Sequence, residues 1–263
     1  MPQKPFITMD GSGDSDSGNV KISPAPPEII FENKDFLVIN KPAGLMVHGV
    51  RVRRARPIDA ARAMTPTLVD WLRSRYPEIG GVGDDPGLRP GIVHRLDKAT
   101  SGVMIVAKTQ SSFELLKRLF QEHQMEKTYF ALVFGVPKKE QGIIDSPIGI
   151  KRGSLKRSIY ATKMAKPAVT EYSVVKKITG SEKEEYALLK VNPKTGRTHQ
   201  IRVHLASIGH PIVGDAMYGK KIQPPFARRL MLHAASLEFS NGAGSRFVFE
   251  APLPPGFTYP QGR

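Results

Sequence analysis

The alternation of apolar and polar positions predicts a chain built mostly of short strands. Residues 28–48 (EIIFENKDFLVINKPAGLMVH) contain two β-rich runs separated by a turn, and Pro42 and Gly44 break the second run. Residues 102–108 (GVMIVAK) form a continuous apolar run of the kind found in central strands. These patterns predict a hairpin that enters a loop, followed later by a buried strand.

Three segments carry apolar residues at helical spacing. They are residues 67–79 (TLVDWLRSRYPEI), residues 111–125 (SSFELLKRLFQEHQM) and residues 198–209 (THQIRVHLASIG), and the second begins with a capping box from Ser111 to Glu114. We predict an amphipathic helix in each segment. The apolar stripes consist of Leu68, Trp71, Leu72, Tyr76, Phe113, Leu116, Phe120, Ile201, Leu205 and Ile208.

Strand-like runs follow one another more often than they alternate with helices. Five further β-rich runs cover residues 127–135, 168–178, 185–191, 232–239 and 246–252. This order favours an α+β fold on a mainly antiparallel sheet over a doubly wound parallel sheet.

The two ends of the chain differ from its middle. The first 27 residues are rich in Gly, Ser, Asp and Pro and poor in large apolar residues, so they cannot bury enough surface to become ordered. We expect a disordered polar tail over residues 1–27, one folded domain over residues 28–255 and a short C-terminal tail over residues 256–263.

Charge and composition narrow the possible partners. The chain has 39 Lys plus Arg against 24 Asp plus Glu, a formal net charge of +15, which is typical of proteins that bind nucleic acid. A cationic surface that only confers solubility is the alternative. The absence of cysteine excludes disulfides and thiolate sites, and neither a long apolar run nor a targeting peptide is evident. We expect a cytoplasmic protein with no membrane partner.

One carboxylate stands among cations just before the buried strand. In GIVHRLDKATSG, residues 91–102, Asp97 lies between Arg95 and Lys98. A single anion near cations stays ionised and can act as a nucleophile or a base. The alternative is structural, because Asp97 can also cap a turn or pair with Lys98 on the surface.

A second cluster of polar residues surrounds the predicted helix at residues 198–209. Arg197 follows a turn at Gly196 and precedes the helix, where a guanidinium opposes the helix dipole and favours a carboxylate partner, for which Asp97 is the candidate. His199 and His204 are five residues apart, so they face different sides of a helix and do not form a zinc pair. We interpret them as packing or RNA-facing histidines.

Six segments together resemble the RluA-type pseudouridine synthase family. They are NKPAGLMVH, GIVHRLDKATSG, EKTYFALVFG, AKPAVTEY, KTGRTHQIRVHLASIGHPIVGDAMYG and MLHAASLEF. The resemblance implies a bent, mainly antiparallel central sheet flanked by helices, with an RNA cleft between two halves. It also implies the isomerisation of uridine in ribosomal or transfer RNA to pseudouridine. The base is detached at nitrogen and rejoined through carbon, so no cofactor or metal is expected.

The resemblance also assigns roles to individual residues. Asp97 resembles the essential aspartate, Arg197 the arginine that pairs with it, and Tyr129 the tyrosine that stacks on the uracil. Arg95 is similar to the residue inserted where the flipped base leaves the stack, and a plain phosphate contact is the alternative. The further residues expected to bind substrate are His94, Lys98, Arg229 and Leu232.

Two segments of the chain are rich in basic residues, and the first of them is an insertion relative to the family pattern. The insertion GVRVRRARPIDAARAMTP, residues 49–66, carries Arg53 and Arg54, and we expect it to bind RNA phosphates near the cleft. We expect the same phosphate-binding role for the second basic run, from Lys151 to Arg157. A solvated cationic loop is the alternative for both. The separate RNA-binding domain that often precedes the catalytic domain in this family is not expected within residues 1–27.

Two rival functions remain at the level of sequence. A non-catalytic RNA-binding or ribosome-assembly factor of the same fold would use the positive charge without the chemistry. A metal-dependent RNA hydrolase would need clustered carboxylates, which the motifs do not supply. We expect a monomer, because no coiled-coil pattern is present.

Overall fold

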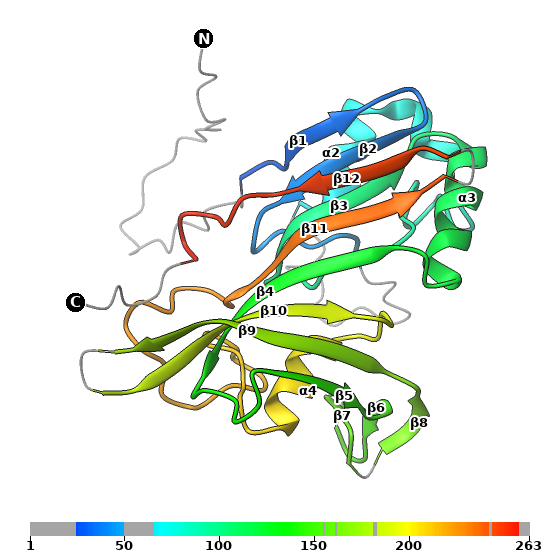
Figure 1. The fold of residues 1–263 in the computed structure, drawn as a ribbon. Coiled ribbons are helices and arrows are strands. Elements are labelled where there is room, and N and C mark those ends of the chain that lie inside the picture. The colour runs from blue at the N-terminus through cyan, green and yellow to red at the C-terminus, as the bar shows by residue number, and fades with distance from the viewer. Residues whose placement is uncertain are drawn as a thin grey trace, which may run out of the picture.

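The computed structural model describes residues 25–49, 66–154, 156–160, 162–180, 183–241 and 244–257. Within them, nine strands form the main sheet: β1 (Glu28–Glu32), β2 (Phe36–Lys41), β3 (Ser101–Ala107), β4 (Glu126–Phe134), β5 (Gln141–Asp145), β9 (Val169–Thr179), β10 (Glu185–Pro193), β11 (Leu232–Ser240) and β12 (Arg246–Glu250). The strand order is β1-β2-β3-β11-β4-β10-β9-β5, and β12 pairs with β11 (Figure 1).

The remaining elements lie on this sheet or beside it. The helices are α2 (Leu68–Arg75), α3 (Gln110–Gln121) and α4 (Gln200–Ser207), with a short 3₁₀ helix at Pro77–Gly81. A small second sheet contains β6 (Ile148–Lys151), β7 (Arg157–Ser158) and β8 (Thr162–Lys166). In Figure 1, α3 lies at one end of the molecule and α4 near the other, next to the small sheet.

The predicted α+β class and mainly antiparallel sheet are confirmed. All strand pairs of the main sheet among the described residues are antiparallel except β3 with β11. The three predicted helices and all eight predicted strands form, whereas β5 to β8 were not predicted. Residues 1–24 and 258–263 lie outside the described residues, so the limits assigned to the two tails stay predictions.

Two hydrophobic clusters divide the molecule into halves. The first is built mainly from β1, β2, β3, α2 and α3, and the second mainly from β4, β10 and α4. Tyr129 on β4 packs against both clusters. The boundary between the two clusters therefore lies at Tyr129.

Two details of the helices differ from the sequence prediction. The capping box of α3 is formed by Thr109 and Ser112, so the predicted pair of Ser111 and Glu114 was wrong. In α4, Ile201 and Leu205 are buried as predicted, but Ile208 follows the helix and is 37% exposed. In both cases the helix boundary is displaced by one or two residues, which moves the cap and the end of the apolar stripe.

Gly102 lies where the parallel strands β3 and β11 approach each other closely. It has φ +116° and lies opposite Ala234 on β11, whose backbone carbonyl occupies the space that a Cβ would need. We expect Gly102→Ala to destabilise the protein by about 2 kcal/mol or more in urea unfolding, because strain and overlap add. Gly153 also has a positive φ but has nothing within 4 Å, so Gly153→Ala is the matched control. Equal losses in the two variants would contradict this expectation.

Candidate active site

A cleft of about 600 Å³ separates the two halves of the molecule. One wall comes from the segment around Asp97 and from α3, and the other comes from β4, the end of β10 and the start of α4. Both sides supply polar side chains. The predicted site residues that line the cleft are His94, Arg95, Asp97, Tyr129, Arg197 and Leu232.

Asp97 lies in a short segment that two backbone contacts fix in place. Its carbonyl accepts the N–H of Thr100 at 3.1 Å, and the next carbonyl, of Lys98, accepts the N–H of Gly44 at 2.8 Å. The buried Lys41 ammonium donates to the carbonyl oxygens of Pro42, at 2.9 Å, and Leu45, at 2.8 Å. The turn after β2 therefore supports the segment that carries the carboxylate.

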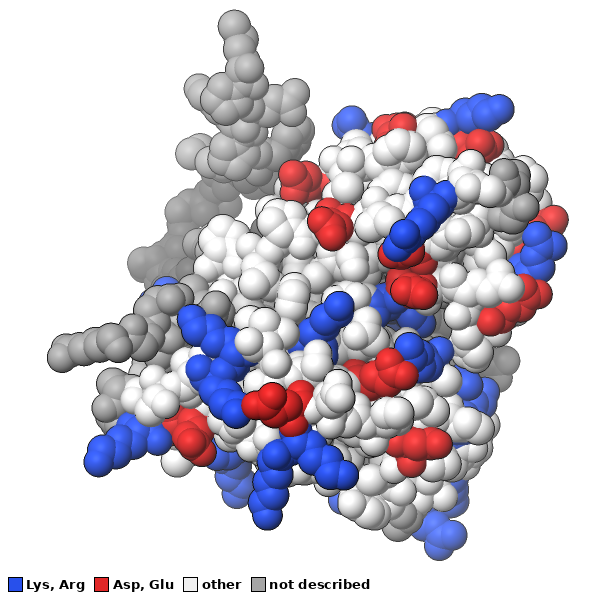
Figure 2. Space-filling view, in the orientation of Figure 1, with Lys and Arg blue, Asp and Glu red and all other residues white. Residues whose placement is uncertain are grey.

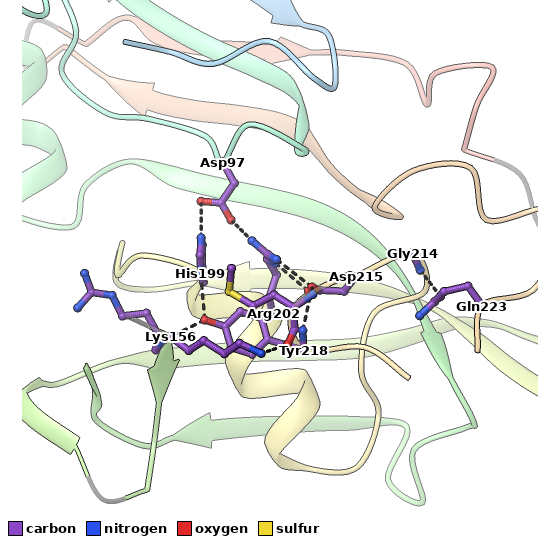
Figure 3. A network of polar contacts seen from close by, with 10 residues as sticks. Asp97, Lys156, His199, Arg202, Gly214, Asp215, Tyr218 and Gln223 are labelled. Carbon is purple, nitrogen blue, oxygen red and sulfur yellow. Dashed lines mark hydrogen bonds and ion pairs between the residues drawn. The ribbon is translucent and has the colours of Figure 1, made fainter. Parts of the chain in front are cut away.

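The cationic partner of Asp97 is Arg202 on α4. Arg202 Nη1 donates to Asp97 Oδ2 at 3.0 Å, across a sequence separation of 105 residues. The same guanidinium donates from Nε and Nη2 to Asp215, at 2.7 and 2.8 Å. Asp215 Oδ1 also accepts the backbone N–H groups of Met217 and Tyr218. Asp215 thus fixes the guanidinium, and the fixed guanidinium orients Asp97 (Figure 3).

Arg202 and Asp215 stabilise each other's charged forms. Burial alone would raise the pKa of Asp215, but the hydrogen bonds and charge of Arg202 outweigh it and lower that pKa below its usual range. Burial would likewise lower the pKa of Arg202, but the bonds to Asp215 and Asp97 raise it. The guanidinium is therefore a permanent positive charge beside Asp97, already desolvated and in position before substrate binds.

His199 approaches the second oxygen of Asp97. Its Nε2 lies 3.8 Å from Asp97 Oδ1, and its Nδ1 lies 3.0 Å from the hydroxyl of Tyr218, which accepts the N–H of Arg157. Burial lowers the pKa of His199, although the charge of Asp97 opposes this shift. The neutral ring can accept the Tyr218 hydrogen at Nδ1, which leaves Nε2–H facing Asp97. His199 has φ +58°, a strained conformation that directs the ring toward the carboxylate.

Arg197 does not pair with Asp97, so that prediction was wrong. No ion pair among the described residues joins them, and Arg197 Nε donates instead to the carbonyl of Pro167 at 3.0 Å. The cause is the turn before α4: Gln200 Oε1 accepts the N–H of Arg197, and the N–H of Gln200 returns to the Arg197 carbonyl. This closed turn places Arg197 on the cleft wall and leaves Arg202 facing Asp97.

Tyr129 forms the floor of the cleft with Leu232. Tyr129 is in the middle of β4, opposite Ala234 and Val191, and it is half-buried. Burial and then the charge of Asp97 raise the pKa of Tyr129, so the phenol stays protonated. An aromatic ring beside a carboxylate can stack on a planar base while the hydroxyl donates a hydrogen bond.

Arg95 is exposed at the mouth of the cleft and is held by His48. Arg95 Nη1 lies 2.9 Å from His48 Nε2, while His48 Nδ1 lies 2.7 Å from the Gly49 carbonyl. Because a carbonyl only accepts, Nδ1 carries the hydrogen and Nε2 accepts from Arg95. Neutral His48 is therefore the form that retains Arg95.

We expect Arg95→Ala to raise the pKa of His48. Burial lowers this pKa first, and the charge of Arg95 lowers it further, while the Gly49 bond opposes both. Removing Arg95 also removes the hydrogen bond that favours the neutral ring. NMR titration of the His48 imidazole in wild type and Arg95→Ala measures the shift, and Arg73→Ala, on the exposed side of α2, is the control. An unchanged pKa in Arg95→Ala would show that the contact is not formed in solution.

Three further predicted residues take different places. His94 stacks on Phe120, and its Nε2 accepts the N–H of Ile105. Because the ring is buried, the pKa of His94 is lowered to about 3 and the imidazole stays neutral. Lys98 is exposed and is not part of the cleft lining. Arg229 is not part of the lining either, because its guanidinium turns to Ser101 Oγ at 2.6 Å. The expected role of Arg229 in binding substrate stays a prediction.

Other predictions concern residues or groups that the structure does not test. Arg53 and Arg54 lie outside the described residues. In the described part of the chain, no three His, Asp or Glu side chains are grouped as metal ligands. None of the helices in that part is long and apolar enough to cross a membrane.

Comparison with known sequences decides the family. Residues 35–207 match the family described as RNA pseudouridylate synthase. The chain belongs to the RNA pseudouridylate synthase family. The resemblance seen in the sequence motifs is thereby confirmed, and several residues of those motifs, Asp97 and Tyr129 among them, line the cleft. The matched region includes Asp97, Tyr129, His199 and Arg202.

Relatives in this family cover most of the chain. An uncharacterized RNA pseudouridine synthase of Aquifex aeolicus is 45% identical over 203 residues, which is 77% of this chain and 59% of that protein. Ribosomal large subunit pseudouridine synthase D of Nitrosomonas europaea is 39% identical over 243 residues, which is 87% of this chain and 62% of that protein. The chain thus spans about three fifths of the length of these two relatives.

Solved structures of the family share the fold. Human RNA pseudouridylate synthase domain containing 1 superposes with a TM-score of 0.65 at 27% identity, covering 93% of this chain and 89% of the human chain. Human RNA pseudouridylate synthase domain containing 4 gives the same TM-score at 29% identity, covering 88% and 90%. The pseudouridine synthase fold predicted for the chain is confirmed.

Sequence reasoning missed most of the residues around Asp97. Arg202, Asp215 and Tyr218 were not selected, and His199 was interpreted as a packing or RNA-facing residue. One signal was available: His199 and Arg202 are three residues apart at the start of a helix, so their side chains lie on the same side. A buried arginine on that side requires a carboxylate, and Asp215 follows within the same motif.

Proposed function

We propose that this chain is an RNA pseudouridine synthase that converts one or more uridines of ribosomal or transfer RNA to pseudouridine, with Asp97 as the essential residue. The observation that carries the proposal is the Asp97–Arg202 ion pair beside Tyr129 in a cleft of about 600 Å³. A carboxylate with a fixed cation on one side and an aromatic ring nearby suits a planar base that must be detached from its sugar and held.

The conversion of uridine to pseudouridine requires three events in the cleft. The bond between the base nitrogen and the ribose must break, the detached base must turn, and a carbon of the base must bond to the same ribose carbon while that base carbon loses its hydrogen as a proton and the freed nitrogen gains one. Asp97 can attack the ribose or the base, or remove a ribose proton. In each route Arg202 keeps the Asp97 carboxylate in one orientation, and Tyr129 holds the base by stacking while it turns.

Access to the target base requires that the nucleotide leave its stack, which costs a few kcal/mol. Arg95 is exposed at the cleft mouth, and a planar guanidinium can stack in the vacated position and hydrogen-bond to base edges. His48 holds Arg95 at that position in the free protein. Arg197 on the opposite wall is the second guanidinium available for backbone phosphates.

Pseudouridine mapping tests the proposal. Unmodified transcripts of ribosomal and transfer RNA are incubated with the protein, treated with carbodiimide and read by reverse transcription. A new stop with wild-type protein that is absent without protein identifies the enzyme and its uridine. Tight RNA binding with no new stop in either pool would favour the alternative, a non-catalytic RNA-binding or ribosome-assembly factor.

The partners follow from the same proposal. Figure 2 shows Lys and Arg side chains gathered mainly over the half of this face that contains β9 and β5, away from the cluster formed by β1 and β2. Such a distribution suits a polyanionic RNA. We further propose that the protein is a cytoplasmic monomer and that Arg53 and Arg54 add phosphate contacts.

A further inference from the structure

Lys127 is a cation of the cleft that the proposed chemistry leaves unused. It lies on β4 two residues before Tyr129. Side chains at i and i+2 of a strand point to the same face and lie about 7 Å apart along it. Lys127 and Tyr129 both line the cleft, as this geometry requires.

The backbone at Lys127 is fixed, but its ammonium has no partner among the residues that the structure describes. Asn192 Nδ2 donates to the Lys127 carbonyl and to Thr128 Oγ1, both at 3.0 Å, which ties the end of β4 to β10. No hydrogen bond or ion pair with a described residue engages Lys127 Nζ, although the side chain is half-buried. A desolvated ammonium without a counter-ion is unfavourable, and an arriving anion would relieve it.

The charged groups around Lys127 do not supply that anion. Lys194, beyond the end of β10, adds positive charge but is itself paired with Glu171 at 2.9 Å. His94 on the opposite side is neutral. Lys117 and His123, from α3 and the residues after it, line the same cleft, as do Asp84, which pairs with Lys117 at 2.8 Å, and Asp85. Asp97, the carboxylate of the proposed chemistry, already has Arg202 as its partner.

We propose that Lys127 Nζ binds a phosphate oxygen of the RNA backbone next to the uridine that enters the cleft. This inference rests on the proposed function and names a binding contact of the same site. A phosphate is the permanent anion that RNA brings close to every base, and an ammonium with three donors can bind it from several directions. Lys127 then positions the nucleotide while Tyr129 holds its base.

If Lys127 binds a phosphate, the RNA affinity should depend on pH in a way that a purely structural lysine would not cause. Burial, and then the charge of Lys194, lower the pKa of Lys127 to about 8. A bound phosphate favours the charged form and raises this pKa, so RNA binding takes up a proton above pH 8. The affinity should be constant below pH 8 and should fall by up to about tenfold per pH unit above it.

The test measures RNA affinity in the Asp97→Asn background, so that the RNA is not modified during the measurement. The probe is the transcript in which wild type forms pseudouridine. We expect Lys127→Met to weaken binding by about tenfold at low salt and to reduce the slope of log K against log salt by about 0.7. It should also remove the loss of affinity above pH 8. Lys127→Arg should retain the affinity at all pH values, because arginine stays charged.

A matched control distinguishes a specific contact of Lys127 from the general effect of losing one positive charge. Lys190 is exposed on β10 opposite Phe130, so it points to the other face of the sheet from Tyr129. Lys190→Met removes one positive charge and should change the affinity much less. Because Lys127→Met removes a charge that is costly to bury, its melting temperature should equal or exceed that of the parent protein, which excludes misfolding as the cause of weak binding.

A second probe locates the contact on the RNA. When the phosphate beside the target uridine is replaced by a neutral methylphosphonate, Lys127→Met should have no further effect on binding. If wild type forms pseudouridine but Lys127→Met binds RNA as tightly as Lys190→Met at every pH, the phosphate contact is wrong and the proposed function stands. If wild type forms no pseudouridine in any transcript, the proposed function itself fails.

Discussion

Asp97→Asn is expected to abolish pseudouridine formation while leaving the protein folded and able to bind RNA. The amide oxygen can still accept from Arg202 Nη1, and Asp215 keeps its two bonds from the same guanidinium. The variant loses only the charge and basicity of one carboxylate, whose side chain is 22% exposed. We expect a rate loss of at least about 10⁴-fold, as for other essential catalytic groups, and a stability change within about 1 kcal/mol.

Single-turnover mapping at the target uridine measures the loss, and thermal unfolding and filter binding measure the other two properties. Asp145→Asn is the matched control, because Asp145 is an exposed carboxylate at the end of β5 and does not line the cleft. It should retain wild-type turnover. A normal rate in Asp97→Asn would overturn the role of Asp97, and loss of RNA binding in that variant would make Asp97 a structural residue.

Most strands and helices could be predicted because the apolar pattern of each segment is enough to specify it. The apolar run of β3 is wholly buried, and the stripe of α3 packs on the sheet, so composition and periodicity were enough. The small sheet of β6 to β8 was missed because its strands have no such pattern. β8 is a run of TKMAK in which four of five residues are exposed, and backbone pairing with β6 defines it.

The partner of Asp97 could not be predicted from the local sequence. Two arginines, Arg197 and Arg202, lie in one motif about 100 residues after Asp97. The sequence separation from Asp97 allows either arginine to contact it. The choice depends on the turn that Gln200 closes and on the left-handed conformation of His199. A charge argument at the helix start selected Arg197, but a buried guanidinium between two carboxylates is the stronger interaction.

Arg202→Met is expected to be the most destabilising single change at this site. It leaves the carboxylate of Asp215, which is 1% exposed, with the N–H groups of Met217 and Tyr218 as its remaining partners in the described part of the chain. Removing one member of a buried ion pair costs about 3–5 kcal/mol, because the other charge stays buried without compensation. Turnover should also be lost, since Asp97 loses its orienting bond. Arg197→Met removes the same charge but only one hydrogen bond, to Pro167, so about 1 kcal/mol is expected.

The pH dependence of stability distinguishes this cause from simple loss of packing. In wild type the pKa of Asp215 lies below its ordinary value of 3.8, so its contribution is present above that pH and is lost as pH falls through the lower value. Without Arg202, burial raises the pKa of Asp215, and the sign reverses. Arg202→Met should therefore become more stable between pH 7 and about pH 5, as the carboxyl takes up a proton, whereas wild type should not.

A second substitution completes the test of the buried ion pair. Asp215→Asn in the Arg202→Met background replaces the unpaired charge by a neutral amide, whose oxygen can still accept from the Met217 and Tyr218 N–H groups. The double variant should recover part of the lost stability at pH 7 and should lose the pH dependence, yet remain inactive, because Asp97 still lacks its cation. Urea unfolding at pH 5 and pH 7 measures both effects. Equal stability of the single and double variants at both pH values would show that the contact of Arg202 with the Tyr218 ring, and not its ion pair with Asp215, holds the site together.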